Sequence, residues 1–244
     1  QQLADPQTTL MILCNPQNPA GNIWDCETLA RIGALCKQYD VIVVSDEIHC
    51  DLTKPGTEYI PFASVDDTCR DISVTCIAPT KTFNLAGLQT AAVYAENSIL
   101  HHRMWRQLNT DEVAEPNAFA IQATIAAFQY GEEWLDELRE YVEKNKQYVT
   151  EFLQEKIPLI HPVAGDATYL MWLDCRKITE SGRQFVKFIR KTSGLYVSGG
   201  NQYGRGGEGF LRVNVATSKL VVEDGMQRLY ESVDAWLKEE KISK

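Results

Sequence analysis

A continuous run of β-branched residues, Val41-Ile42-Val43-Val44, constrains the fold of this chain more than any other feature. Four apolar residues without alternation are typical of a parallel strand that is covered on both faces. Another apolar run, Leu10 to Cys14, comes before it. Between the two runs, Asp25 or the residue before it can cap a helix with one apolar face. Two more short strands are predicted at 73–78 and 90–95. This order of strands and helices predicts an α/β domain with a largely parallel sheet.

The second half of the chain predicts a different architecture. From Trp134 to Leu153 apolar residues recur at helical spacing, which predicts one long amphipathic helix ending before Pro158. The later segments with the pattern of strands or helices are 169–173, 182–191, 210–215 and 219–238. We therefore expect a large domain over residues 1–133 and a smaller α+β domain over residues 134–244.

Composition argues against several classes of partner. A net charge of −9 disfavours nucleic acid and anionic membrane surfaces. No apolar run approaches the roughly 20 residues of a membrane span. The 7 cysteines are scattered without a C-x-x-C pair, which favours reduced thiols in a cytoplasmic protein over a disulfide framework or a zinc site. Since an apolar strand follows Gln1 almost at once, we expect a domain that is incomplete at its N-terminus.

Two segments at predicted strand ends could carry chemistry. Asn15-Pro16-Gln17-Asn18-Pro19-Ala20-Gly21 is either a simple Pro/Gly turn or a ligand-binding turn. In the second case the Asn18 amide donates to a ligand oxygen, because open α/β sheets bind ligands at the carboxyl ends of their strands. Ser45-Asp46-Glu47-Ile48-His49 follows the buried run. Its carboxylates either emerge into water, or Asp46 faces a cationic ring nitrogen with His49 on the same rim.

Two further segments carry isolated cations. Lys81 lies in Ala78-Pro79-Thr80-Lys81-Thr82-Phe83-Asn84-Leu85-Ala86-Gly87-Leu88. It is either a surface lysine or, given its small, hydroxylic and apolar surroundings, an amine suited to Schiff-base chemistry. Arg212 interrupts the apolar strand Phe210 to Val215 and needs an anionic partner. That partner is either an internal carboxylate or the carboxylate of a substrate, held by two parallel hydrogen bonds.

Two other patterns do not fit the chemistry that they suggest. Gly204-Arg205-Gly206-Gly207-Glu208-Gly209 matches the dinucleotide fingerprint G-x-G-x-x-G, but it precedes a strand instead of opening a helix. We expect a flexible loop over the active site there. His101 and His102 are adjacent and not one helical turn apart, so we expect a solvated helix and no metal site.

Taken together, the four segments resemble the class I/II aminotransferase family of pyridoxal-phosphate (PLP) enzymes. N-P-x-N-P-x-G, D-E-x-H, T-K-T-F-N-L-A-G-L and R-V-N-V-A all appear in the family order, and the spacings between Asn18, Asp46 and Lys81 are typical of it. S-D-E-I-H and P-T-K-T-F-N-L-A-G-L look most like cystathionine β-lyases and related cysteine C–S lyases. Many aminotransferases have tyrosine in place of His49 and arginine in place of Gln89, and a phosphate-binding serine is common in place of Ala78.

The resemblance implies a fold and a set of residue roles. It implies a PLP-dependent transferase-like (fold type I) large domain with a mostly parallel sheet. It also implies pyridoxal 5'-phosphate as the cofactor. Lys81 would be the Schiff-base lysine and Asp46 the partner of the ring nitrogen. Asn18 and His49 would steady the 3′ oxygen of the ring. Thr80 would contact the phosphate of the cofactor, and Arg212 would bind the carboxylate of the substrate.

The resemblance also implies a function. We expect a PLP-dependent C–S β-lyase that acts on cystathionine or other cysteine conjugates as a homodimer. An aminotransferase remains the alternative, because both reactions need the same residues. A second alternative is a non-catalytic truncated fragment, since the phosphate-binding loop of the family would lie before Gln1.

Overall fold

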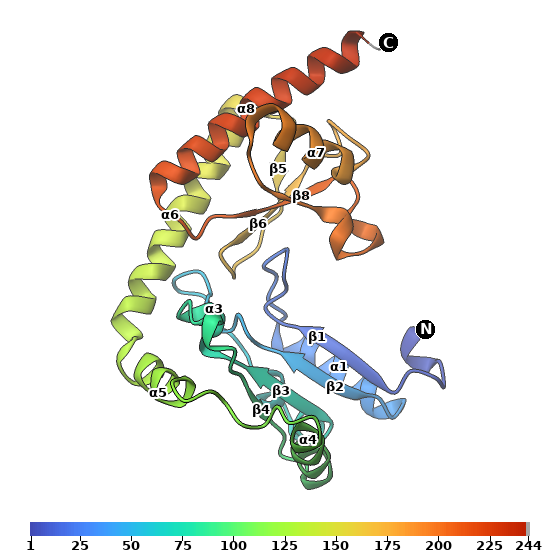
Figure 1. Cartoon of the computed structure of the whole chain (residues 1–244). Helices are drawn as coiled ribbons and strands as arrows, with labels where there is room; N and C mark the ends of the chain where they lie inside the picture. Colours follow the sequence, from blue (N-terminus) through green and yellow to red (C-terminus); the bar gives the residue numbers. More distant parts are fainter. Residues whose placement is uncertain (243–244) are drawn as a thin grey trace. The chain divides into compact units, whose positions relative to one another are not determined.

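The computed structural model describes residues 1–242, with side chains as far as Glu239 (Figure 1). The chain divides into two compact units. The first unit comprises Gln1–Gln17 and Asn22–Leu138, and the second comprises Asn18–Gly21 and the chain from Arg139 onward. The division falls inside the long helix α6 (Glu132–Lys156), on which the sequence placed a boundary at Trp134.

The first unit contains a four-stranded sheet of order β1-β2-β3-β4. Its strands are β1 (Leu10–Cys14), β2 (Ile42–Asp46), β3 (Ser73–Ile77) and β4 (Ala92–Tyr94). β1, β2 and β3 are parallel, and β4 is antiparallel to β3. The prediction of a largely parallel α/β sheet is therefore confirmed, with an antiparallel strand at one edge.

Helices connect and follow these strands. They are α1 (Cys26–Gln38), α2 (Asp67–Asp71), α3 (Pro79–Thr82), α4 (Ser98–Thr110) and α5 (Ala120–Tyr130). Asp25 is the one of the two predicted positions that caps α1, since its carboxylate accepts a hydrogen bond from the Thr28 N–H at 2.7 Å. His101 and His102 are exposed on α4, which begins three residues before them at Ser98.

The sheet of the first unit is fully covered on one face only. Leu13 and Val43 are buried there and pack with Leu29 of α1. On the opposite face, Leu10 and Ile12 are 49% and 69% exposed. Ile42 and Val44 lie on that face beside Leu10 and Ile12 and are only partly buried, so the expectation that the β-branched run is covered on both faces is wrong. Residues of a strand alternate between faces, and the buried core cluster lies on one of them.

The second unit is the predicted smaller α+β unit. Its antiparallel sheet has the order β5-β6-β8-β7. The strands are β5 (His161–Pro162), β6 (Leu170–Asp174), β7 (Ser198–Gly199) and β8 (Phe210–Asn214). With the C-terminal part of α6, the helices are α7 (Gly182–Ser193) and α8 (Lys219–Ile242). The glycine-rich segment before β8 forms two 3₁₀ turns, η4 (Gly200–Tyr203) and η5 (Arg205–Gly207).

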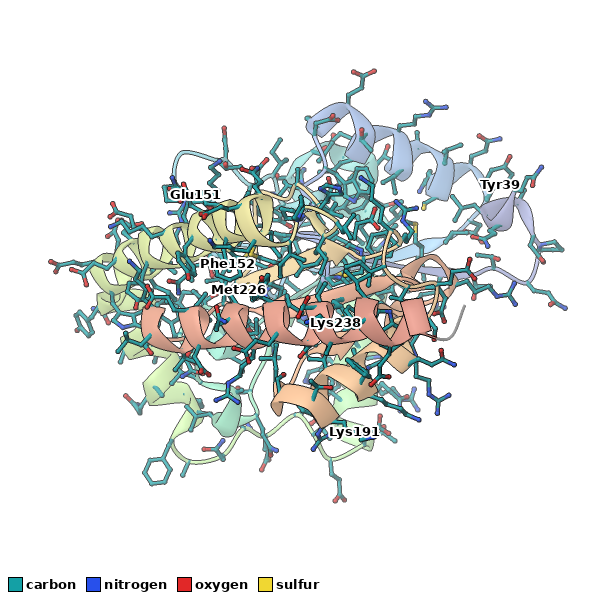
Figure 2. The ribbon with its side chains drawn as sticks, turned by 90° about the horizontal axis from the view of Figure 1, so that it is seen from above. Tyr39, Glu151, Phe152, Lys191, Met226 and Lys238 are labelled. Carbon is teal, nitrogen blue, oxygen red and sulfur yellow. The ribbon has the colours of Figure 1, made fainter. Side chains whose placement is uncertain are left out.

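One core holds the second unit together. Buried residues from every helix and the two central strands form it, among them Leu153, Leu173, Phe185, Leu211 and Met226. Figure 2 shows α8 with Met226, which is buried, and the exposed Lys238 near its other end. Burial of these apolar side chains stabilises the unit.

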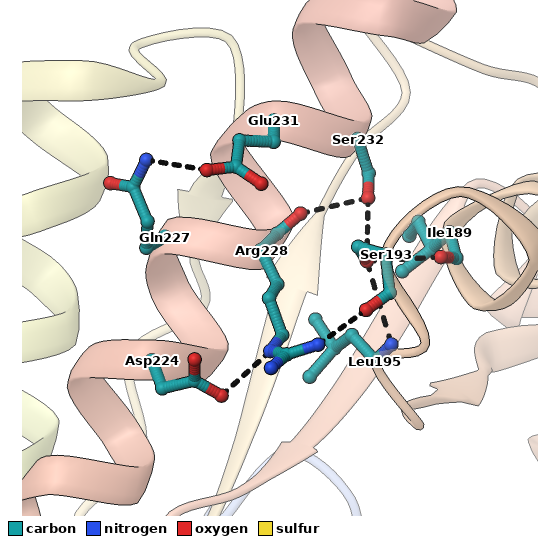
Figure 3. A network of polar contacts seen from close by, with 8 residues as sticks. All are labelled: Ile189, Ser193, Leu195, Asp224, Gln227, Arg228, Glu231 and Ser232. Carbon is teal, nitrogen blue, oxygen red and sulfur yellow. Dashed lines mark hydrogen bonds and ion pairs between the residues drawn. The ribbon is translucent and has the colours of Figure 1, made fainter.

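Polar contacts between α7 and α8 fix how the two helices pack (Figure 3). The Arg228 guanidinium donates to Asp224 at 2.7 Å and to the Ser193 carbonyl at 2.6 Å. The Ser232 hydroxyl donates to the Ser193 hydroxyl at 2.9 Å. The bond to Ser193 satisfies a carbonyl at the C-terminal end of α7, where a cation is also favourable to the helix dipole.

Two general findings limit the kinds of site. No helix in residues 1–242 is both long enough and apolar enough to cross a bilayer. The 7 cysteines are free thiols.

Candidate active site

The carboxyl edge of the first sheet gathers the predicted site residues of the first unit. Asp46 is the last residue of β2 and lies opposite Cys76 of the parallel strand β3. The chain leaving β3 enters α3, which carries Thr80 and Lys81. Because neighbouring parallel strands end at one edge, both segments emerge together. His49, in the turn after β2, is only 3% exposed.

Direct contacts hold the lysine segment in place. The buried Thr82 hydroxyl donates to the Asp51 carboxylate at 3.0 Å, which joins α3 to the turn after β2. The Phe83 ring packs against Phe128, with ring centroids 5.2 Å apart, and against Trp134 at 5.9 Å. The two residues that directly follow Lys81 are therefore held in place by contacts with later and earlier parts of the first unit.

Glu47 directly follows Asp46, but its side chain is buried. It is 2% exposed, and its carboxylate accepts hydrogen bonds from the Ser45 hydroxyl at 2.8 Å and the Phe62 N–H at 3.1 Å. Burial raises the pKa of Glu47, although the bonds from Ser45 and Phe62 oppose the shift. The reading in which both carboxylates of this segment emerge into water is thus wrong for Glu47. The Phe62 N–H that donates to Glu47 comes from a later segment of the chain, and such a distant contact leaves no simple signal in the sequence.

Hydrogen bonds connect the turn after β1 to the segment that contains Asp46. The Tyr59 hydroxyl donates to the Asn15 carbonyl at 2.9 Å, and the Asn15 N–H donates to the Asp46 carbonyl at 3.1 Å. Burial, with a further contribution from the Glu47 charge, raises the pKa of Tyr59, which keeps its hydroxyl protonated. Sequence reasoning gave no role to Tyr59, which joins the end of β1 to the segment that contains Asp46.

In the second unit the structure brings Asn18 and Arg212 together. The Arg212 Nη1 donates to the Asn18 Oδ1 at 3.2 Å. The same guanidinium lies over the Tyr203 ring, with its Cζ 4.9 Å from the centroid. Within the described residues it pairs with no carboxylate, so the internal salt bridge considered from the sequence is not formed. Since its Oδ1 is occupied by Arg212, Asn18 has its amide N–H groups available to donate elsewhere.

A close backbone contact sets the conformation of the turn that carries Asn18. Gly21 has a φ of +72°, and its carbonyl accepts from the Ala167 N–H at 3.1 Å. A Cβ on Gly21 would lie 2.5 Å from the Ala167 carbonyl oxygen. Glycine is therefore required at this position by both the backbone conformation and the contact.

Comparison with known proteins supplies the family. The sequence profile described as "Aminotransferase class I and II" matches residues 1–229. This chain belongs to that family. Its fold is the fold type I PLP-dependent architecture, an α/β fold with a mixed sheet.

Several individual relatives are named as lyases. The chain is 42% identical over 228 residues to "Cystathionine beta-lyase PatB" of Bacillus subtilis (strain 168), covering 93% of this chain and 59% of that protein. The PLP-bound C–S lyase of Staphylococcus hominis superposes with a TM-score of 0.86 at 32% identity, covering 95% of this chain and 60% of that one. Cystalysin of Treponema denticola, whose structure contains pyridoxal 5'-phosphate, gives a TM-score of 0.92 at 27% identity and covers 96% and 59%. The chain thus spans about 59% of the length of the curated relative.

Proposed function

We propose that the chain is the part of a PLP-dependent C–S β-lyase that holds the cofactor's lysine and the substrate's carboxylate. The observation that supports this most strongly is the 42% identity to a protein named as a cystathionine β-lyase. Two C–S lyase structures from Staphylococcus hominis, at 34% and 32% identity, support the same reaction class.

The residues of the first unit fit the cofactor. Lys81 supplies a primary amine that can bond to an aldehyde carbon, and Asp46 supplies a carboxylate at the same sheet edge to pair with a protonated ring nitrogen. Thr80 supplies a hydroxyl for a phosphate oxygen, and His49 a largely buried ring for the 3′ oxygen. In the second unit, the Asn18 amide keeps N–H donors that suit an oxygen acceptor of the cofactor.

Arg212 fits the substrate. Its guanidinium faces no carboxylate of the described chain and keeps donors that can grip an α-carboxylate through two parallel hydrogen bonds. We therefore take the substrate carboxylate as the anionic partner of Arg212, which lies inside an otherwise apolar strand. Loss of the guanidinium would weaken substrate binding more than it would slow the chemistry that follows.

Lys81 would move the proton that starts the reaction. When bound, the cofactor supplies an electron sink for the pair left at the substrate Cα. The Lys81 amine would take the Cα proton as general base. Loss of this proton would allow the Cβ–S bond to break with sulfur leaving as a thiolate, and hydrolysis of the three-carbon fragment that remains would give pyruvate and ammonia. Asp46 would keep the ring nitrogen protonated throughout, because a nearby carboxylate favours its charged form.

One assay separates this reaction from transamination, which the family name also covers. The full-length protein is incubated with PLP and cystathionine, and pyruvate is measured without any keto-acid acceptor. We expect pyruvate and free thiol in equal amounts. Pyruvate that forms only when a keto acid is added would identify an aminotransferase and refute the lyase.

We further propose a homodimer in the cytoplasm as the assembled form. Sedimentation of the full-length protein over a range of concentrations tests this. A protein that sediments as a monomer at every concentration would contradict the dimer.

A further inference from the structure

Aromatic rings line the sheet face from which Arg212 projects. Trp172 of β6 lies directly opposite Arg212 of β8, and Phe210 is two residues before Arg212 on the same strand, so all three side chains share one face. The Trp172 and Phe210 rings stack, with centroids 5.2 Å apart and planes within 6°. Tyr203 meets Trp172 edge to face at 5.6 Å and 87°. This series of rings ends on the Arg212 guanidinium, 4.9 Å from the Tyr203 centroid.

The glycine-rich loop places Tyr203 in this series. A Cβ on Gly200 would lie 2.2 Å from the Gly207 carbonyl oxygen and 2.6 Å from the Trp172 ring. A Cβ on Gly207 would lie 2.0 Å from the Gly200 carbonyl oxygen. Only glycines allow the two 3₁₀ turns to approach each other and Trp172 so closely. The segment that resembles a dinucleotide fingerprint thus has a packing role, which is to seat η4 and its Tyr203 on the Trp172 ring.

The Tyr203 ring and the Asn18 amide contact different parts of the Arg212 guanidinium. A cation–π contact uses the flat face of the group, whereas its N–H donors point outward in the plane. Asn18 accepts from Nη1 in that plane. The two contacts together fix both the position and the tilt of the plane, and they leave the other in-plane donors available.

We propose that Tyr203 is a positioning residue that holds the Arg212 guanidinium ready to bind the carboxylate of the substrate. This inference rests on the proposed role of Arg212 in substrate binding. A guanidinium without the ring would have to be immobilised when the carboxylate binds. Ordering one such side chain weakens affinity by about two- to tenfold.

Propionate is a suitable probe, because it has the carboxylate but no amine to react with the cofactor. Propionamide is its neutral control. The readout is an NMR titration of the arginine Nε–H signals of the full-length protein, with the Arg212 signal assigned by its loss in Arg212→Gln. Tyr203→Leu removes the ring, Tyr203→Phe keeps it, and Tyr196→Leu is the matched control. Tyr196 is 75% exposed and lies 5.1 Å from the Cζ of another arginine, Arg190.

We expect Tyr203→Leu to weaken propionate binding about two- to tenfold and to shift the Arg212 Nε–H signal, because the ring current is lost. Tyr203→Phe and Tyr196→Leu should bind as the wild type does. Unchanged affinity in Tyr203→Leu, with propionate still dependent on Arg212, would overturn this inference alone. Wild-type protein that binds propionate no better than Arg212→Gln does would overturn the proposed role of Arg212, and this inference with it.

The wild-type spectrum provides a test that does not depend on the folding of the leucine variant. The Tyr203 ring should displace the Arg212 Nε–H signal upfield of its position in the unfolded protein. A signal at the unfolded position would refute the contact on which the inference is built.

Discussion

Gly21→Ala should destabilise the chain well beyond the usual cost of replacing a glycine. Its φ of +72° costs a residue with a Cβ about 1–2 kcal/mol. The new Cβ would also lie 2.5 Å from the Ala167 carbonyl oxygen, a backbone atom that can move only by shifting the chain. Such a shift would break the bond from the Ala167 N–H to the Gly21 carbonyl, worth about 1 kcal/mol. The expected loss in unfolding free energy is therefore about 2–4 kcal/mol.

Gly56→Ala is the matched control for this experiment. Gly56 has a similar φ of +83°, but a Cβ added there would have no atom within 4 Å. It should lose only the conformational cost of about 1–2 kcal/mol. Urea unfolding measures both variants, and calorimetry should show a fall in Tm of about 2–4 °C per kcal/mol in a chain of this size. If Gly21→Ala is no less stable than Gly56→Ala, the close contact with Ala167 does not determine the turn that carries Asn18.

Two further predictions concern the carboxyl edge of the first sheet. Because burial raises the pKa of Glu47, its contribution to stability is fully present below the unfolded pKa, near 4.5, and is lost as the pH rises through the folded value. Glu47→Gln, which cannot ionise, should therefore gain stability relative to the wild type as the pH rises above 4.5, by about 1.4 kcal/mol for each unit between the two pKa values. Urea unfolding across a pH series checks this, and a difference that does not vary with pH would contradict it. Thr82→Val should cost about 1–2 kcal/mol through the lost bond to Asp51. A double-mutant cycle with Asp51→Asn should show coupling, and zero coupling energy would count against the anchoring of the lysine segment.

Local signals in the sequence predicted much of the fold. Asp25 caps α1, and the run at Leu10–Cys14 coincides with β1. These features depend on neighbours within a few residues, such as Thr28, whose N–H donates to the Asp25 carboxylate. The parallel arrangement of β1, β2 and β3 followed from the alternation of strand and helix.

Features that depend on distant residues could not be predicted in the same way. Glu47 is buried because Ser45 and Phe62 satisfy its carboxylate, and Phe62 lies fifteen residues away. Burial of Val43 but not of Ile12 depends on which face of the sheet α1 covers. Tyr203 reaches Arg212 only because two 3₁₀ turns pack on Trp172. The motifs located the candidate residues, but only the three-dimensional contacts show what holds them.

The central claim is that Lys81 is the residue to which the cofactor is attached. Borohydride reduction of the full-length protein with excess PLP, followed by peptide mapping, tests it most directly. We expect one pyridoxyl adduct, on the peptide that contains Lys81, and none in Lys81→Ala, which should also lose the visible absorbance of the bound cofactor. An adduct on another lysine, or an unchanged spectrum in Lys81→Ala, would contradict the assignment.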